Sequence, residues 1–224
     1  MFYQIPPARF RRLRHPVPRI EKKPTMEEVT SVLQKYHLSN SYILYPAQFW
    51  AHKNHVNLLK ALAILQEKFK LDLHLVLTGS DQGNLEYIIN IVQDLQLKEK
   101  VHFLGFIPHD DLVALYAGAF ALTYMTYFGP ENLPPLEAFA CGCPVIASAV
   151  AGAAEQLGEA ALLVDGSRPE EIALSIKKIQ DDPQLRETLI RKGLRRAKEY
   201  SAPDYLRDVF TMLDEFEVIR SNWP

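Results

Sequence analysis

The sequence has 224 residues, 48% of them hydrophobic, and a formal net charge of −2 at pH 7. This length fits one large domain or two small ones, and the composition is that of a globular chain with a sizeable core, which excludes intrinsic disorder. The sequence holds no apolar run of 18 or more residues and no signal-peptide pattern, so we expect a soluble, cytoplasmic protein, with peripheral membrane association left open.

The charge is unevenly distributed at the N-terminal end. Residues 1–24 carry seven Lys and Arg side chains against one acid, Glu21. Such a run serves either as an arm for nucleic acid or anionic lipid, or as a solvated connector. Four prolines up to Pro18 and the lack of apolar periodicity argue against a helix. We therefore favour a connector over residues 1–40 and expect no nucleic-acid partner.

From residue 41 onward, short apolar runs alternate with longer amphipathic ones. The pattern predicts strands at residues 41–47, 71–80, 101–106, 120–126, 144–150 and 160–166. It predicts helices at residues 55–70, 84–97, 110–119, 133–141 and 151–158. Near-continuous apolar strands separated by helices are typical of a parallel sheet covered on both faces.

The predicted fold is therefore α/β, a Rossmann-like doubly wound parallel sheet over residues 41–200. Three further helices are expected at residues 169–181, 183–200 and 202–219, forming a C-terminal helical pack, with residues 201–224 as the last helix. Cys141 and Cys143 are too close in sequence for an unstrained disulfide. No histidine lies at zinc spacing from them, so we expect buried, inert thiols and no metal.

Ligands of open parallel sheets bind beyond the carboxyl ends of the strands. The first loop there places His52 and Lys53 just before a helix that Asn54 is expected to cap. A lysine at this place can reach an anion, although most loop lysines are solvated charges. The second loop has Gly79 directly after a buried strand, where a ligand can approach the backbone. Neither loop matches a dinucleotide or P-loop fingerprint, which excludes those enzyme classes.

The third loop leads into the helix LPPLEAFAC. Asn132 is expected to cap it, and two prolines in its first turn lack N–H groups. The amides of Asn132, Leu133 and Leu136 are then left as an anion-binding corner near the positive end of the helix dipole. Glu137 follows one turn in. It could simply complement the dipole, worth about 0.3–1 kcal/mol, but a carboxylate in an apolar helix is costly unless it is satisfied, and a pair of ligand hydroxyls would satisfy it.

Five runs occur in the order and spacing of one enzyme family: PAQFWAHKN, LVLTGS, VHFLGFIPHDDLVALY, FGPENLPPLEAFACGCPVIAS and AALLVDGSRPEEIA. Over about residues 40–200 they resemble the donor-binding, C-terminal half of a family 4 retaining glycosyltransferase of GT-B fold, in its mannosyltransferase-like subset. The resemblance implies a nucleotide-diphosphate sugar as donor, an unknown acceptor, and no metal or cofactor. It also implies an acceptor-binding N-terminal half. Residues 1–40 are too few to form that half, so we expect a fragment or a solitary donor domain.

The resemblance assigns roles by position. It implies that Glu137 bonds the ribose hydroxyls and that Lys53 contacts the diphosphate. Backbone groups at Gly105, Phe106 and Ile107 would border the base. The amides of Asn132 and Leu133 would face the phosphates and the sugar.

Two positions depart from the family pattern. The motif's first glutamate, expected eight positions before Glu137, is replaced by Gly129, which Pro130 follows. Glu131 is nearby but out of register, and is either a substitute that turns toward the sugar or a favourable charge near the helix start. Gln48 stands where a basic residue is expected, five positions before Lys53.

The leading hypothesis is transfer of a sugar from a nucleotide-diphosphate donor with retention of configuration. The isolated chain is expected to bind the donor and transfer nothing. A nonenzymatic nucleotide-sugar-binding module is the alternative, favoured by the absent glutamate and the absent acceptor half. A third hypothesis is an interaction domain whose basic segment binds a polyanion.

Overall fold

The structure of the protein, a computed structural model, describes residues 10–18, 20, 22–38, 41–129 and 132–221. Its centre is a six-stranded sheet of order β3-β2-β1-β4-β5-β6, and all neighbouring strands are parallel. The strands are β1 Tyr42–Pro46, β2 His74–Thr78, β3 Val101–Phe103, β4 Ala121–Tyr124, β5 Val145–Ser148 and β6 Ala161–Val164. The predicted Rossmann-like, doubly wound fold is confirmed.

Burial on both faces explains the composition of the central strands. All residues of β1 are buried, because β1 lies between β2 and β4 in the middle of the sheet. The strands β4 and β5 are buried along their whole length as well. Strands in this position need near-continuous apolar sequence, which is the pattern that predicted them.

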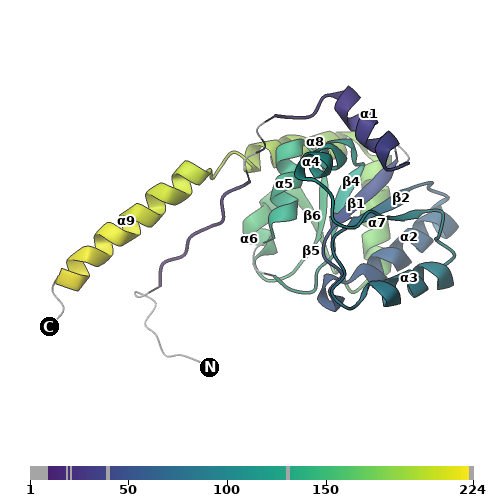
Figure 1. Ribbon diagram of the computed structural model, residues 1–224, viewed down its shortest axis with the longest axis horizontal. Coiled ribbons are helices and arrows are strands. Elements are labelled where there is room, and N and C mark those ends of the chain that lie inside the picture. Colours follow the sequence, from purple (N-terminus) through teal and green to yellow (C-terminus); the bar gives the residue numbers. More distant parts are fainter. Residues whose placement is uncertain (1–9, 19, 21, 39–40, 130–131, 222–224) are drawn as a thin grey trace.

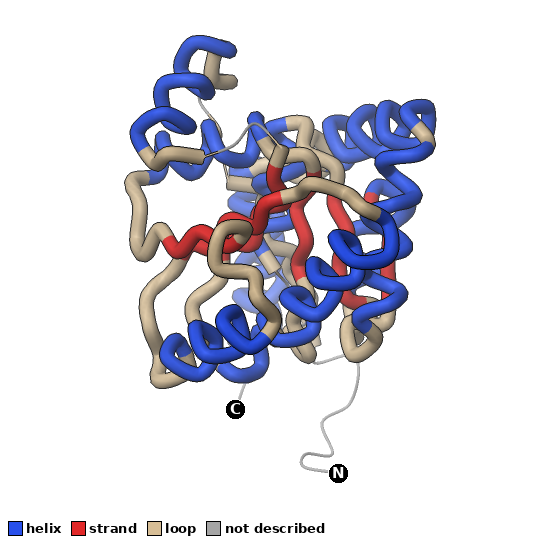
Figure 2. Tube along the Cα trace, turned by 90° about the vertical axis from the view of Figure 1, so that its right-hand side faces the viewer, coloured by secondary structure: helices blue, strands red, loops and turns tan. Residues whose placement is uncertain are grey.

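The helices form a layer on each face of the sheet. They are α1 Met26–Lys35, α2 His55–Phe69, α3 Leu85–Asp94, α4 His109–Gly118, α5 Leu133–Cys141, α6 Ala153–Leu157, α7 Pro169–Asp181, α8 Pro183–Arg196 and α9 Ala202–Ser221, with short 3₁₀ helices η2 Ala51–Lys53 and η3 Gly158–Ala160. On one face α2 packs against α3 and α7, and on the other α5 packs against α4 and α8 (Figure 1). Figure 2 shows the strands side by side between these layers.

Helix α1 lies within the segment that we predicted to be a connector. Thr25 and Glu28 form a capping box at its start: the Glu28 N–H donates to Thr25 Oγ1 at 3.2 Å, and the Thr25 N–H donates to the Glu28 carboxylate at 2.6 Å. The helix buries Val29 and Leu33 and packs on α4. The spacing Thr-x-x-Glu was the sequence signal for it.

The C-terminal helices only partly follow the prediction. Helix α7 has the predicted bounds, and α8 ends at Arg196 rather than at residue 200. Helix α9 contains no buried residue and leads away from the domain (Figure 1). The expected C-terminal pack is therefore wrong for α9, because an amphipathic pattern shows that a face is apolar and not which surface covers it.

Part of the basic N-terminal segment has acidic partners. As predicted, residues 10–18 form no helix. Arg11 pairs with Glu215 of α9 at 3.3 Å, and Arg12 pairs with Glu155 of α6 at 2.9 Å. These contacts favour the connector interpretation over a free polyanion-binding arm. Across the residues that the structure describes, no helix combines the length and the hydropathy required to cross a bilayer.

Candidate functional site

The candidate site lies at the carboxyl edge of the sheet, where the strand order changes direction between β1 and β4. The loops that follow these two strands are bonded to each other. The backbone carbonyl of His52 accepts from the Tyr127 N–H at 2.9 Å and from Thr126 Oγ1 at 3.3 Å. The loop carrying Lys53 and the loop leading into α5 are thus one connected unit.

Lys53 is the cation of this edge. Its Nζ donates to the hydroxyl of Tyr124 at 3.2 Å, and Tyr45 donates its own hydroxyl to the Lys53 carbonyl at 2.5 Å. The side chain is partly buried, and this burial lowers the pKa of Lys53 from its ordinary value. Among the described residues Lys53 has no carboxylate partner within ion-pair distance. A partly desolvated cation with no counter-ion is suited to bind an anionic ligand.

Glu137 is the carboxylate of the site and lies on α5. It is half-buried, and its Oε2 accepts a hydrogen bond from the hydroxyl of Tyr116 at 2.7 Å. Tyr124 accepts a hydrogen bond from Lys53, and its pKa is raised to about 12 by burial and, after that, by the negative charge of Glu137. Lys53 and Glu137 are therefore both near Tyr124.

Asn132 departs from its predicted role. It precedes α5 but makes no side-chain cap, because its side chain donates to the carbonyl of Gly129 at 2.9 Å. Its backbone N–H donates to Gln156 Oε1 at 3.1 Å, and the Gln156 Nε2 donates back to the Asn132 carbonyl at 3.0 Å. The expectation that the Asn132 amide is free is therefore wrong. No sequence pattern indicates this pair of hydrogen bonds, because Gln156 belongs to α6, beyond the next strand.

Gly79, one of the predicted site glycines, is required by the close packing of the protein's own backbone. A Cβ at Gly79 would lie 2.5 Å from the carbonyl oxygen of Ala47, and Gly79 has a φ of +141°. Its N–H donates to the carbonyl of Gly105 at 2.8 Å, so the loops after β1, β2 and β3 are in mutual contact. Phe106 is 90% exposed, whereas Ile107 is buried. The side chain of Ile107 therefore does not border a base, and the role of its backbone stays a prediction.

The remaining predicted residues lie around the start of α5. Gly129 has a φ of +134°, which favours glycine, and a Cβ there would meet the side chain of Asn132 at 2.9 Å. Leu133 begins α5 and is 39% exposed. Pro130 and Glu131 lie outside the described residues, so the role of Glu131 stays a prediction.

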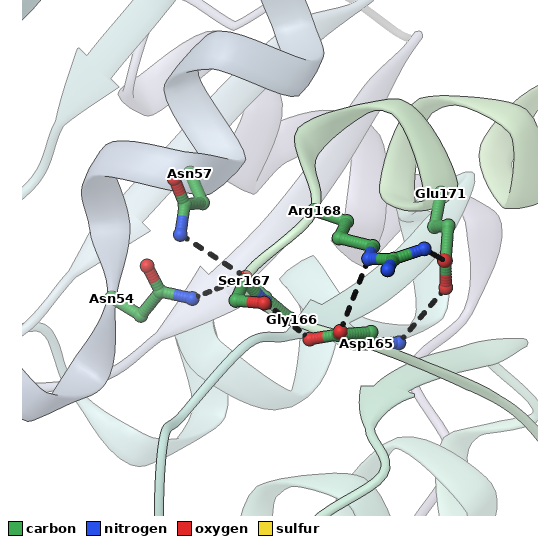
Figure 3. A network of polar contacts seen from close by, with 7 residues as sticks. All are labelled: Asn54, Asn57, Asp165, Gly166, Ser167, Arg168 and Glu171. Carbon is green, nitrogen blue, oxygen red and sulfur yellow. Dashed lines mark hydrogen bonds and ion pairs between the residues drawn. The ribbon is translucent and has the colours of Figure 1, made fainter.

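Asn54, the residue after Lys53, is hydrogen-bonded to the loop that follows β6. Asn54 is buried and has a left-handed backbone with a φ of 56°, so it does not cap α2 as predicted. Its Nδ2 instead donates to the carbonyl of Gly166 at 2.7 Å, and Asn57 bonds the same oxygen at 3.3 Å. The network in Figure 3 comprises Asn54, Asn57, Asp165, Gly166, Ser167, Arg168 and Glu171. It holds the position of Lys53 from the loop after β6.

A column of stacked rings borders the site, and the sequence patterns did not predict it. His52 stacks on Phe128 with ring centroids 4.4 Å apart, and Trp50 lies beyond His52 at 6.3 Å. Burial and then the charge of Lys53 lower the pKa of His52, so the imidazole is mostly neutral at pH 7. Phe128 is 60% exposed and Trp50 is 43% exposed. The column adds an apolar wall beside Lys53.

The thiols are buried, and the cavity that the structure shows near α6 does not include Lys53 or Glu137. Cys141 and Cys143 are free and buried as predicted, and burial raises the pKa of each to about 12. Within the described ranges no three His, Cys, Asp or Glu side chains are grouped as metal ligands. A cavity of about 390 Å³ lies between residues 12–17, α6 and the residues that follow α8, and its lining includes Leu136 and Gln156 but not Lys53 or Glu137.

Comparison with known proteins establishes the family. Residues 34–196 match the family described as glycosyl transferases group 1. The chain belongs to this family. Both the Rossmann-like fold and the polar edge between β1 and β4 fall inside the matched residues, as does α5 with Glu137.

Curated relatives of this group 1 glycosyltransferase chain are sugar transferases. It is 32% identical over 175 residues to the O-antigen chain mannosyltransferase B of Escherichia coli, covering 78% of this chain and 46% of that protein. It is 31% identical over 167 residues to the D-inositol 3-phosphate glycosyltransferase of Salinispora tropica, covering 70% of this chain and 35% of that protein. The chain thus spans less than half the length of these relatives.

Solved structures share the fold at lower identity. The glycosyltransferase WaaG, described as involved in lipopolysaccharide biosynthesis, superposes with a TM-score of 0.78 at 22% identity, covering 93% of this chain and 58% of that one. Anabaena HepE in complex with UDP and glucose superposes with a TM-score of 0.78 at 21% identity, covering 86% and 53% of the two chains. These neighbours agree with the GT-B assignment.

Proposed function

We propose that this chain binds a nucleotide-diphosphate sugar at the edge between β1 and β4, and that it is the donor-binding part of an enzyme that transfers the sugar to an acceptor. The observation that carries the proposal is that the loop carrying Lys53 is hydrogen-bonded to the loop leading into α5, the helix that carries Glu137. One ligand that needs both a cation and a hydroxyl acceptor is a nucleoside diphosphate. Its phosphates are anionic and its ribose carries a vicinal diol.

The proposed mechanism is electrostatic. Lys53 stabilises the charge that develops on the departing diphosphate, and its partial burial strengthens the interaction. Glu137 accepts the ribose hydroxyls and fixes the nucleotide. The reaction is proposed to proceed with retention and without a metal, as in family 4 enzymes of the mannosyltransferase-like subset, because the sequence motifs resemble those of that subset. The name of the Escherichia coli relative supports a mannosyl donor.

The acceptor contacts are proposed to lie outside residues 41–200. The relatives are about two to three times as long as the matched region, which supports a division of labour between this part and the rest of the protein. The chain by itself is then expected to bind the donor without transferring the sugar. A nonenzymatic nucleotide-sugar-binding module is the alternative, and Gly129 favours it because that position offers no carboxylate to grip the sugar.

Calorimetric titration tests the proposal. The chain is titrated with UDP, GDP, their glucose and mannose conjugates, and the matching nucleosides. We expect saturable binding of at least one diphosphate, tighter than its nucleoside, and a weaker complex in Glu137→Gln for every ribonucleotide regardless of the sugar attached. An absence of saturable heat with all diphosphates at millimolar concentration contradicts donor binding. Acceptor-dependent turnover by the chain alone contradicts the division of labour.

A further inference from the structure

The Glu137 carboxylate is contacted by a residue, Tyr116, to which the family resemblance assigns no role. Tyr116 lies on α4, which packs against α5, and only 1% of the residue is exposed. Its hydroxyl donates to Glu137 Oε2 at 2.7 Å. Across the described part of the chain, the Glu137 carboxylate has no other hydrogen-bond partner and no ion pair. The tyrosine is thus the group that fixes the carboxylate in the free protein.

The protonation of Tyr116 sets the direction of this hydrogen bond. Burial, and then the charge of Glu137, raise the pKa of Tyr116 well above its usual range. The hydroxyl therefore keeps its proton at neutral pH and donates it to the carboxylate. Because a carboxylate offers two oxygens with about four lone-pair sites, Oε1 and part of Oε2 stay available to accept two hydroxyls from a ligand.

A glutamate side chain loses rotamer freedom when a ligand fixes it. A hydrogen bond already made in the free protein removes part of that entropic cost, and such preorganisation raises affinity. The contact also compensates a half-buried carboxylate for water that it has lost. A ribose diol would then meet an acceptor already held in one orientation.

We propose that Tyr116 is a positioning residue of the donor site, whose hydroxyl holds the Glu137 carboxylate in the orientation that receives the vicinal diol of the nucleotide ribose. This inference rests on the proposed function. It adds a residue that touches no ligand atom and acts through Glu137. Its signature is that the loss of the hydroxyl affects only ligands that carry the diol.

The test removes one oxygen atom, in Tyr116→Phe, and uses a matched control. Tyr42 is also fully buried, and its hydroxyl donates at 2.7 Å to the carbonyl of Leu115, the residue next to Tyr116. Tyr42→Phe therefore deletes an equivalent buried hydroxyl beside the same helix without touching Glu137. Each protein is titrated with UDP and GDP and with the 2′,3′-dideoxy form of each, and its melting temperature is recorded without ligand.

We expect Tyr116→Phe to weaken the ribonucleotide up to about tenfold, the cost of immobilising one rotamer-rich side chain on binding, and to leave the dideoxy analogue within about twofold of wild type. Tyr42→Phe should change neither ligand, whatever it does to the melting temperature. Equal losses for both ligands in Tyr116→Phe would show a general structural role and overturn the inference. An unchanged affinity for both would overturn it too.

A double variant covers the case in which Tyr116→Phe folds poorly. In Tyr116→Phe/Glu137→Gln a neutral amide replaces the carboxylate, so no buried charge loses its partner. Compared with Glu137→Gln alone, we expect the same ratio of ribonucleotide to dideoxy affinity. A changed ratio would mean that Tyr116 acts otherwise than through Glu137, and the inference would be wrong. If wild type binds no diphosphate, the proposed function and this inference both fail, whereas diol discrimination that survives Tyr116→Phe defeats only this inference.

Discussion

Removal of the charge of Lys53 is the perturbation that most sharply tests the phosphate assignment. Lys53→Met keeps an unbranched side chain of similar length and deletes only the ammonium group. A charge pair at about 4 Å is worth about 1 kcal/mol in water and about 4 kcal/mol at an effective dielectric constant of 20. Lys53 is partly buried and bonded to Tyr124, so its interaction with a phosphate lies between these limits, at about 2 kcal/mol.

A loss of that size corresponds to a roughly 30-fold weaker diphosphate complex. The nucleoside, which lacks phosphates, should bind Lys53→Met within about twofold of wild type. Raising the ionic strength from about 0.1 M to 1 M shortens the screening length from about 10 Å to 3 Å. The deficit of the variant for the diphosphate should shrink accordingly, because salt weakens the wild-type attraction.

The assay is calorimetric titration at both ionic strengths, with Lys60→Met as the control. Lys60 lies on α2, the helix that follows Lys53, and is exposed to solvent. Its replacement should change neither ligand measurably. Equal losses of nucleoside and diphosphate in Lys53→Met, or a deficit that salt does not reduce, would refute the assignment of Lys53 to the phosphates.

Burial lowers the pKa of Lys53, so we expect diphosphate affinity, measured relative to the nucleoside between about pH 7 and 10, to fall with rising pH at a lower pH than that at which an ordinary lysine loses its proton. Lys53→Arg should abolish this pH dependence, and an identical profile in that variant would contradict the prediction. Gly79→Ala should lower the free energy of unfolding by about 2–4 kcal/mol, because a Cβ would lie 2.5 Å from a backbone carbonyl oxygen at a φ of +141°. Gly83→Ala, at a φ of +86° with open space around the Cβ, should cost only about 1 kcal/mol, and equal urea-denaturation losses in the two variants would contradict the steric explanation. Gln156→Leu should cost about 1–3 kcal/mol, because both backbone groups of Asn132 lose their partner; unchanged urea denaturation would show that this pair of hydrogen bonds contributes nothing.

Much of the fold could be predicted because its elements are defined by local patterns. Helix α5 has the predicted bounds, since prolines mark its first turn and Gly142, with a φ of 77°, ends it. The central strands followed from burial on both faces. Helix α1 was missed although its capping box and the helical spacing of Val29, Val32 and Leu33 were present in the sequence. The connector indicated by the basic, proline-containing residues 1–24 was extended to residue 40.

The site was predictable only where one loop supplies a residue by itself. Lys53 and Glu137 could be placed because each follows a strand at the carboxyl edge. The partners of the site residues are set by packing: Tyr116 reaches Glu137 from a neighbouring helix, and Gln156 reaches the α5 loop from beyond β5. These contacts join residues about 20 positions apart and depend on the angle at which two elements pack. No spacing in the sequence predicts them for that reason.

A structure of the chain with bound nucleoside diphosphate tests the central claim most directly, since that claim is that the edge between β1 and β4 binds the donor. We predict ribose hydroxyls at hydrogen-bond distance, about 2.7–3.0 Å, from the Glu137 carboxylate. The diphosphate should lie within reach of Lys53 Nζ, above Tyr124. A nucleotide bound instead in the cavity between residues 12–17 and α6, or one whose ribose faces away from Glu137, would contradict the account.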